Sequence, residues 1–173
     1  MPCTSAPCEP AARADGRGVV GAVGTGIQAR RTMTLPPVLY VEDDDNDVLL
    51  MRRAWAWVGV ENPLQVVTDG EKALRYLSGD GPYANRSDYP MPCLVLLDLK
   101  MPKVTGLDVL RWIRSQPALQ NLRVIIYSSS KLPLDINAAH AQRIEAYFVK
   151  PESYDEWVAM VDNLKVYWLK GRS

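Results

Sequence analysis

Short runs of apolar residues mark five expected strands in the part of the chain that follows residue 34. They cover residues 38–41, 63–67, 93–97, 123–127 and 146–149. The run at 93–97 is apolar throughout, which is typical of a strand buried on both faces of a parallel sheet, and the run at 123–127 is expected to be buried as well. Parallel strands need a crossover connection, so helices are expected between the runs.

The stretches between these runs carry the spacing of amphipathic helices. The expected helices cover about 47–58, a segment opening at Thr68, a segment after Gly106, 133 to about 144, and about 154–169. Two of them start with the Ser/Thr-x-x-Glu pattern of a capping box, Thr68 with Glu71 and Ser153 with Glu156. Each strand is therefore followed by a helix.

The pattern also indicates which apolar residues are expected in the core and which segments could contact a partner. The tryptophans of the helices are expected mostly in the core: Trp55, Trp57, Trp112, Trp157 and Trp168. The last helix has a second apolar edge (Met160, Tyr167 and Leu169), which would suggest a docking or dimer face if it were exposed. Residues 78–92 form a long loop rich in glycine and proline, expected to be either a mobile insertion or a contact for a partner.

Five strands alternating with five helices predict an α/β fold, a doubly wound five-stranded parallel sheet with helices on both faces. Strand order 2-1-3-4-5 would place the first and third strands side by side at the topological switch point. We expect one domain over residues 35–171. Residues 1–34 are rich in Ala, Gly, Pro and Arg, and are expected to be a disordered N-terminal extension or to precede a true translation start at Met33.

Composition narrows the class of protein. The 173 residues include 20 basic and 20 acidic side chains. The chain therefore has no net positive charge that would attract nucleic acid. No apolar run approaches the roughly 18 residues needed to span a bilayer. The three cysteines lack the spacing of a metal finger. We expect a cytoplasmic protein that binds neither nucleic acid nor membrane.

Polar residues gather where the expected strands end. Glu42 and Asp43 follow the first strand, Asp98 the third, Ser128 the fourth and Lys150 the fifth. In a parallel sheet these ends share one edge, where open α/β folds bind ligands. Crowded carboxylates repel unless a cation neutralises them, and hard oxygen ligands suit Mg²⁺. A lysine and a hydroxyl favour a phosphoryl group, so the pattern predicts a phosphoryl-transfer site with a carboxylate as acceptor.

With these residues in this order, and with the contexts DLKMP at 98–102 and KP at 150–151, the chain from about 35 to 171 resembles the receiver domain of response regulators in two-component signalling. The resemblance implies a CheY-like (flavodoxin-like) fold and a single-domain regulator that accepts a phosphoryl group from a sensor histidine kinase. It implies no enzyme beyond self-catalysed phosphotransfer and autodephosphorylation, and output by protein–protein contact.

The resemblance also implies roles at the acidic end of the site. Asp98 matches the phospho-acceptor and Asp43 a direct Mg²⁺ ligand, with Glu42 acting through water. Lys100 would lend its backbone carbonyl to the metal, and its side chain could alter the access of hydrolytic water. Because the acidic block continues, the metal-binding pair could instead be Asp43 and Asp44.

Three further residues match the switch of the family. Ser128 resembles the hydroxyl residue that reaches toward the phosphoryl group, Lys150 the lysine that pairs with it, and Tyr147 the aromatic residue whose rotamer reports the state. Residues 78–92, the DLKMP context and the aromatic last helix are similar to small stand-alone regulators paired with phytochrome-type histidine kinases.

Two other functions stay open at this point. A binding module that keeps the fold without phosphorylation would lack the acidic pair or the lysine, which this chain has. A phosphohydrolase would need an acid/base aspartate two residues after the nucleophile, where this chain has Lys100. We also expect a homodimer through the fourth helix, fifth strand and fifth helix.

Overall fold

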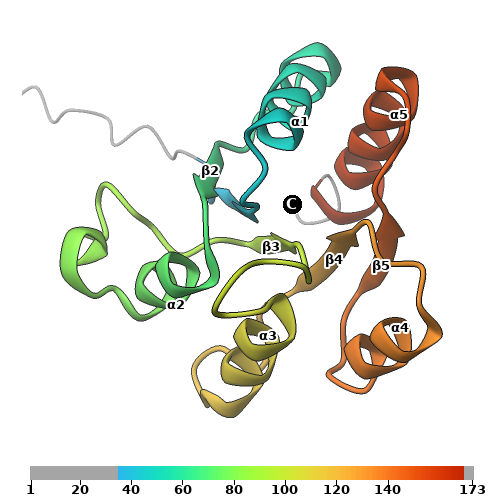
Figure 1. Ribbon diagram of the computed structural model, residues 1–173. Helices are drawn as coiled ribbons and strands as arrows, with labels where there is room; N and C mark the ends of the chain where they lie inside the picture. The colour runs from blue at the N-terminus through green and yellow to red at the C-terminus, as the bar shows by residue number, and fades with distance from the viewer. Residues whose placement is uncertain (1–34, 170–173) are drawn as a thin grey trace, which may run out of the picture. The chain divides into compact units, whose positions relative to one another are not determined.

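The predicted α/β fold is confirmed by the computed structural model, which describes residues 35–169 (Figure 1). Five strands form one sheet in the order β2-β1-β3-β4-β5, and every neighbouring pair is parallel. The strands are β1 (Val38–Val41), β2 (Leu64–Val67), β3 (Leu94–Leu97), β4 (Val124–Ser128) and β5 (Ala146–Val149). The expectations for residues 1–34, including a start at Met33, lie outside the described residues.

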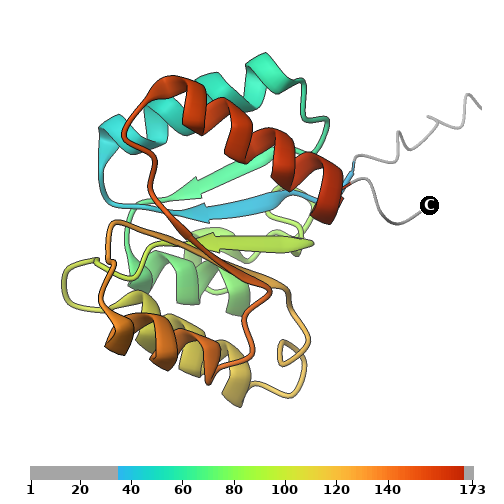
Figure 2. The same ribbon diagram turned by 90° about the vertical axis from the view of Figure 1, so that its right-hand side faces the viewer.

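Helices cover both faces of the sheet. They are α1 (Asp45–Val58), α2 (Gly70–Ser78), α3 (Gly106–Ser115), α4 (Pro133–His140) and α5 (Tyr154–Leu164), with a short 3₁₀ turn η1 (Gly81–Tyr83) and a π-helical turn η2 (Lys165–Leu169). Helices α1 and α5 lie on one face, and α2, α3 and α4 on the other (Figure 2). Within residues 35–169, no helix is both long and apolar enough to cross a membrane.

Successive residues of the central strands point to opposite cores, as the two-residue period of a strand requires. In β1, Leu39 packs with the helices α2, α3 and α4, and Tyr40 with α1 and α5. The expected burial is confirmed for β3 and β4, and β1 is buried throughout as well. Strands β2 and β5 are partly exposed because each is an edge strand with a single neighbour.

Two helix boundaries differ from the sequence prediction. Helix α2 is capped by Asp69, whose carboxylate accepts from the backbone N–H of Lys72, so the predicted cap at Thr68 was wrong. Helix α4 ends at His140 instead of near residue 144. The chain leaves the helical path there: Arg143 has a left-handed φ of +56°, and the guanidinium of Arg114 donates to the carbonyls of Gln142 and Arg143.

The expected burial of apolar residues in α1 and α5 also differs from the structure. Trp57 is 77% exposed because it follows the buried Trp55 by two positions and so faces away from the sheet. Met160 is buried and packs with Trp157 in the core beneath α5, so the expected second apolar edge does not include it. Tyr167 of that edge is exposed.

The loop between α2 and β3 is anchored to the domain. The Arg86 guanidinium donates to the carbonyls of Tyr76 and Leu77 at the end of α2, each at 2.8 Å. The rings of Tyr83 and Tyr89 pack on each other with centroids 5.0 Å apart, and both lie against Tyr76. The Arg86 hydrogen bonds satisfy carbonyls that the helix end leaves without partners, and the rings pack the loop against α2.

The segment after β3 approaches α3 so closely that only glycine fits at the first position of that helix. A Cβ on Gly106 would lie 2.0 Å from the carbonyl oxygen of Asp98 and 2.8 Å from the Cα of Leu99. The Gly106 N–H donates to the Leu99 carbonyl at 3.1 Å. Because the obstructing atoms are backbone, this glycine fixes the course of the chain directly after Asp98.

Substituting Gly106→Ala is therefore expected to lower the free energy of unfolding by about 3 kcal/mol or more, through overpacking against backbone. Gly81→Ala is the control, because no atom lies within 4 Å of its added Cβ and only its left-handed φ of +58° opposes alanine, at about 1 kcal/mol. Chemical denaturation measures both. Equal losses would contradict a steric role for Gly106.

Candidate functional site

The parallel register brings the predicted site residues to one edge of the sheet. Val41 pairs with Leu97, so Glu42 and Asp98, the next residues of each chain segment, lie side by side. Their backbone N–H groups continue the ladder to the carbonyls of Val67 and Val41 at 3.1 Å each. Ser128 ends β4 and Lys150 follows β5 at the same edge. Glu42 and Asp98 are buried.

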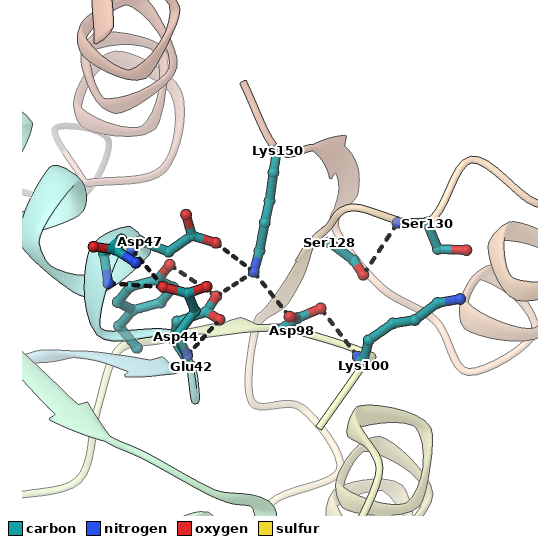
Figure 3. Close-up of polar contacts among 10 residues, drawn as sticks. Glu42, Asp44, Asp47, Asp98, Lys100, Ser128, Ser130 and Lys150 are labelled. Carbon is teal, nitrogen blue, oxygen red and sulfur yellow. Dashed lines mark hydrogen bonds and ion pairs between the residues drawn. The ribbon is translucent and has the colours of Figure 1, made fainter. Parts of the chain in front are cut away.

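Lys150 is surrounded by three carboxylates (Figure 3). Its Nζ lies 2.7 Å from Glu42 Oε2, 2.7 Å from Asp47 Oδ2 and 2.9 Å from Asp98 Oδ2. An ammonium group has three N–H donors, so these contacts use all of them. Burial lowers the pKa of Lys150, but the hydrogen bonds to the three carboxylates outweigh that effect and raise the pKa overall.

Glu42 is held in a tight hydrogen-bond environment. Its Oε2 accepts from the Tyr40 hydroxyl at 3.0 Å and its Oε1 from the Asp44 N–H at 3.2 Å. Burial raises the pKa of Glu42 to about 7 in spite of the opposing effect of Lys150. A proton therefore competes for this carboxylate near neutral pH.

Glu42, Asp43 and Asp98 offer a cluster of oxygen atoms, one from each side chain, within 4.8 Å of one another. Hard carboxylate oxygens at this spacing fit a divalent cation, and Asp43 is exposed, which leaves the cluster open to solvent. Asp44 has a different task, because its Oδ1 caps α1 by accepting from the Asn46 N–H at 2.7 Å. The geometry thus favours Glu42 with Asp43 over the alternative pair Asp43 and Asp44.

The second carboxylate oxygen of Asp98 faces the β3–α3 loop. Oδ1 accepts from the Lys100 N–H at 3.0 Å. The Lys100 side chain extends toward α4, where its Nζ lies 3.7 Å from Asp135 Oδ2, and is about half exposed. The Lys100 backbone thus contacts the Asp98 carboxylate, while its side chain links the loop to α4.

A chain of hydrogen bonds leads from Ser128 to Tyr147. The buried Ser128 Oγ accepts from the Ser130 N–H at 3.4 Å. The Ser130 hydroxyl is hydrogen-bonded to the Asp135 carboxylate, and the Ser130 carbonyl accepts from the Tyr147 hydroxyl at 2.8 Å. The end of β4, the first turn of α4 and β5 are thus joined through one serine.

Asp47 is the site residue that sequence reasoning missed. It is the first residue of the helix expected over about 47–58, and it does lie in the first turn of α1. Its contact with Lys150 comes from the direction of the helix and not from a strand end. The sequence signal that would have indicated Asp47 is its position one helical turn after Asp43, a carboxylate that follows a strand end.

Comparisons with known proteins identify the family of this chain. A family model described as "Response regulator receiver domain" matches residues 38–162. The probable methanogenesis regulatory protein FilR2 of Methanothrix harundinacea is 33% identical over 135 residues, covering 76% of this chain and 83% of the relative. Response regulator Rcp1 of Synechocystis is 30% identical over 137 residues, covering 78% of this chain and 91% of Rcp1.

Solved structures give the same family. Response regulator RPA3017, in red light signaling of R. palustris, superposes with a TM-score of 0.75 and 36% identity, over 80% of this chain and 97% of that one. The Mn²⁺-bound form of Rcp1 superposes with a TM-score of 0.72 and 27% identity, over 80% of this chain and 98% of Rcp1.

The pKa of Glu42 predicts how cation binding depends on pH. Below about pH 7 a cation must displace the Glu42 proton, so the affinity is expected to fall up to about tenfold per pH unit as pH decreases, and to level off above pH 7. Calorimetric titration with Mn²⁺ between pH 6 and 8 measures this. Glu42→Gln should bind more weakly with a flatter profile, and an unchanged slope in that variant would contradict the assignment.

Proposed function

The chain belongs to the response regulator receiver family of two-component signalling, and from this premise we propose that Asp98 accepts a phosphoryl group from a sensor histidine kinase. The observation that carries the proposal is the setting of Asp98. Its buried carboxylate lies between the Lys150 ammonium and the Lys100 N–H, and belongs to the oxygen cluster with Glu42 and Asp43. We place the receiver domain at residues 35–171.

The proposed reaction needs little from the protein beyond position and charge. An oxygen of Asp98 attacks phosphorus while the phosphorus–nitrogen bond of the kinase phosphohistidine breaks. The histidine nitrogen keeps the electron pair and takes a proton from solvent. Lys150 offers positive charge to the phosphoryl oxygens, and the transfer is self-catalysed by the receiver.

We propose Mg²⁺ as the cation of the acidic cluster. Asp43 and Asp98 would hold it directly, Glu42 would act through water, and the Lys100 carbonyl would complete the protein ligands. Three clustered carboxylates fit this ion, and the similarity to Mn²⁺-bound Rcp1 supports a divalent metal. When bound, magnesium supplies charge neutralisation to the carboxylates and the incoming phosphoryl group.

The switch proposed for the phosphorylated state involves Ser128 and Tyr147. When the Ser128 hydroxyl turns toward the phosphoryl group, the Ser130 N–H loses its acceptor. Ser130 also holds the Tyr147 hydroxyl and Asp135 of α4, so this change reaches β5 and α4 together. Phosphorylation would then shift the population of two arrangements of this surface.

We propose that the phosphorylated protein signals by contact with another protein, and that autodephosphorylation returns it to the unphosphorylated state. Both steps would take place in the cytoplasm, where the kinase obtains its phosphoryl donor. A kinase of phytochrome type is supported by the similarity to RPA3017, a regulator in red light signaling. FilR2 is named for methanogenesis regulation and is also similar. The proposal for the kinase class therefore rests on the RPA3017 likeness and on the resemblance in residues 78–92.

A homodimer through α4, β5 and α5 is also proposed. Leu132, Leu134 and Val149 of this face expose 57%, 79% and 39% of their surface. Apolar side chains gathered on a face that the switch alters favour an interface.

Intact mass after incubation with acetyl phosphate tests the acceptor. The protein should gain a single phosphoryl adduct that requires Mg²⁺, and Asp98→Asn should gain none, because it lacks the nucleophilic oxygen pair. Asp45→Asn is a matched control, since Asp45 is an exposed aspartate in the first turn of α1. An adduct that persists in Asp98→Asn would overturn the assignment, and no adduct in any protein would favour a phosphorylation-independent binding module.

Light scattering at high concentration, with and without acetyl phosphate, tests the dimer. The wild-type protein should form dimers with the phosphodonor, and Leu134→Asp should remain monomeric because it places a charge on the apolar face. Leu49→Asp changes a leucine that is 54% exposed on α1 and should leave dimers intact. A wild-type monomer under both conditions would count against the interface.

A further inference from the structure

The three N–H donors of the Lys150 ammonium are all bonded to carboxylates, and these carboxylates have different tasks in the proposed reaction. Asp98 receives the phosphoryl group, and Glu42 belongs to the oxygen cluster that fits a cation. Asp47 lies outside that cluster, and its Oδ2 is 2.7 Å from Lys150 Nζ. Of the three partners of Lys150, Asp47 alone is neither the proposed acceptor nor a member of the oxygen cluster.

We propose that Asp47 is a positioning residue, which holds the Lys150 ammonium at the acceptor before phosphorylation and keeps it there when Asp98 carries the phosphoryl group. This role rests on the proposed function of Asp98. Phosphorylation removes the free carboxylate that Lys150 contacts at 2.9 Å, and the freed N–H donor then turns to a phosphoryl oxygen while the contact with Asp47 remains.

The local structure suits this task. Asp47 lies on α1, and its backbone N–H is bonded to the capping Asp44 carboxylate at 3.4 Å, so its position is set by a helix and not by a mobile loop. Its side chain is 23% exposed and that of Lys150 is 12% exposed, so the pair is screened only weakly by solvent. A lysine has a flexible four-carbon stem, so a fixed carboxylate reduces the orientations that its charge samples.

A purely structural explanation is that Asp47 serves only as an acidic residue at the start of a helix. Asp45 separates the two explanations. It lies in the same first turn of α1, is exposed, and forms no ion pair within residues 35–169. Asp45→Asn and Asp47→Asn remove the same charge near the same helix terminus, but only Asp47→Asn removes the contact with Lys150.

The test uses the full chain and two measurements. Intact mass follows the rate of adduct formation from acetyl phosphate with Mg²⁺. Asp47→Asn is expected to slow it by about tenfold or more, as a misplaced catalytic group does, while Asp45→Asn stays within about twofold of wild type. Asp47→Glu restores a carboxylate and should recover part of the rate.

Nuclear magnetic resonance of the Lys150 ammonium gives a second measurement, which a change in helix stability alone would not affect. With beryllofluoride as the phosphoryl analogue, the hydrogen-bonded ammonium signal should persist in wild type and Asp45→Asn, and be lost in Asp47→Asn. Equal rates and a retained signal in Asp47→Asn would overturn the role of Asp47 while leaving Asp98 as acceptor. If wild type forms no adduct on Asp98, the proposed function and this role both fail.

Discussion

The ion cluster around Lys150 is the interaction on which the site depends. One ammonium group meets carboxylates from the end of β1, from α1 and from the end of β3, and so ties these elements together at the sheet edge. Buried charges are costly unless paired, and here one positive charge faces three negative ones. The remaining negative charge explains why the edge suits a divalent cation. Burial, with a smaller contribution from the charge of Asp98, raises the pKa of Glu42.

The topology explains how much of this site could be predicted from the sequence. Apolar runs indicated the strands, and parallel strands place Glu42, Asp98, Ser128 and Lys150 at one edge whatever the details of packing. Asp47 could not be found in this way, because its carboxylate reaches the lysine from the side of a helix. The roles assigned to the site residues stay predictions.

Other features depended on contacts between distant residues. The turn after α4 is held by Arg114, which comes from α3 and binds two carbonyls after α4. No local pattern in residues 133–144 shows this. The exposed Trp57 was misjudged for a different reason: hydrophobicity alone favoured burial, whereas its place two residues after Trp55 puts it on the outer face of α1. Two other segments of the site are held in different ways. The segment directly after Asp98 is fixed by backbone packing against Gly106, and the segment after β4 is fixed by hydrogen bonds of Ser130.

The anchored loop between α2 and β3 has a consequence for how such chains diverge. Tyr76 is almost fully buried, and the tyrosines of the loop form part of its cover. Deleting the loop would expose that ring and remove the Arg86 guanidinium from the carbonyls at the end of α2. A lineage that shortened the loop would need a smaller or more polar residue at position 76 and a new way to end α2. A change in the length of this loop is therefore expected to require a change at position 76 and at the end of α2.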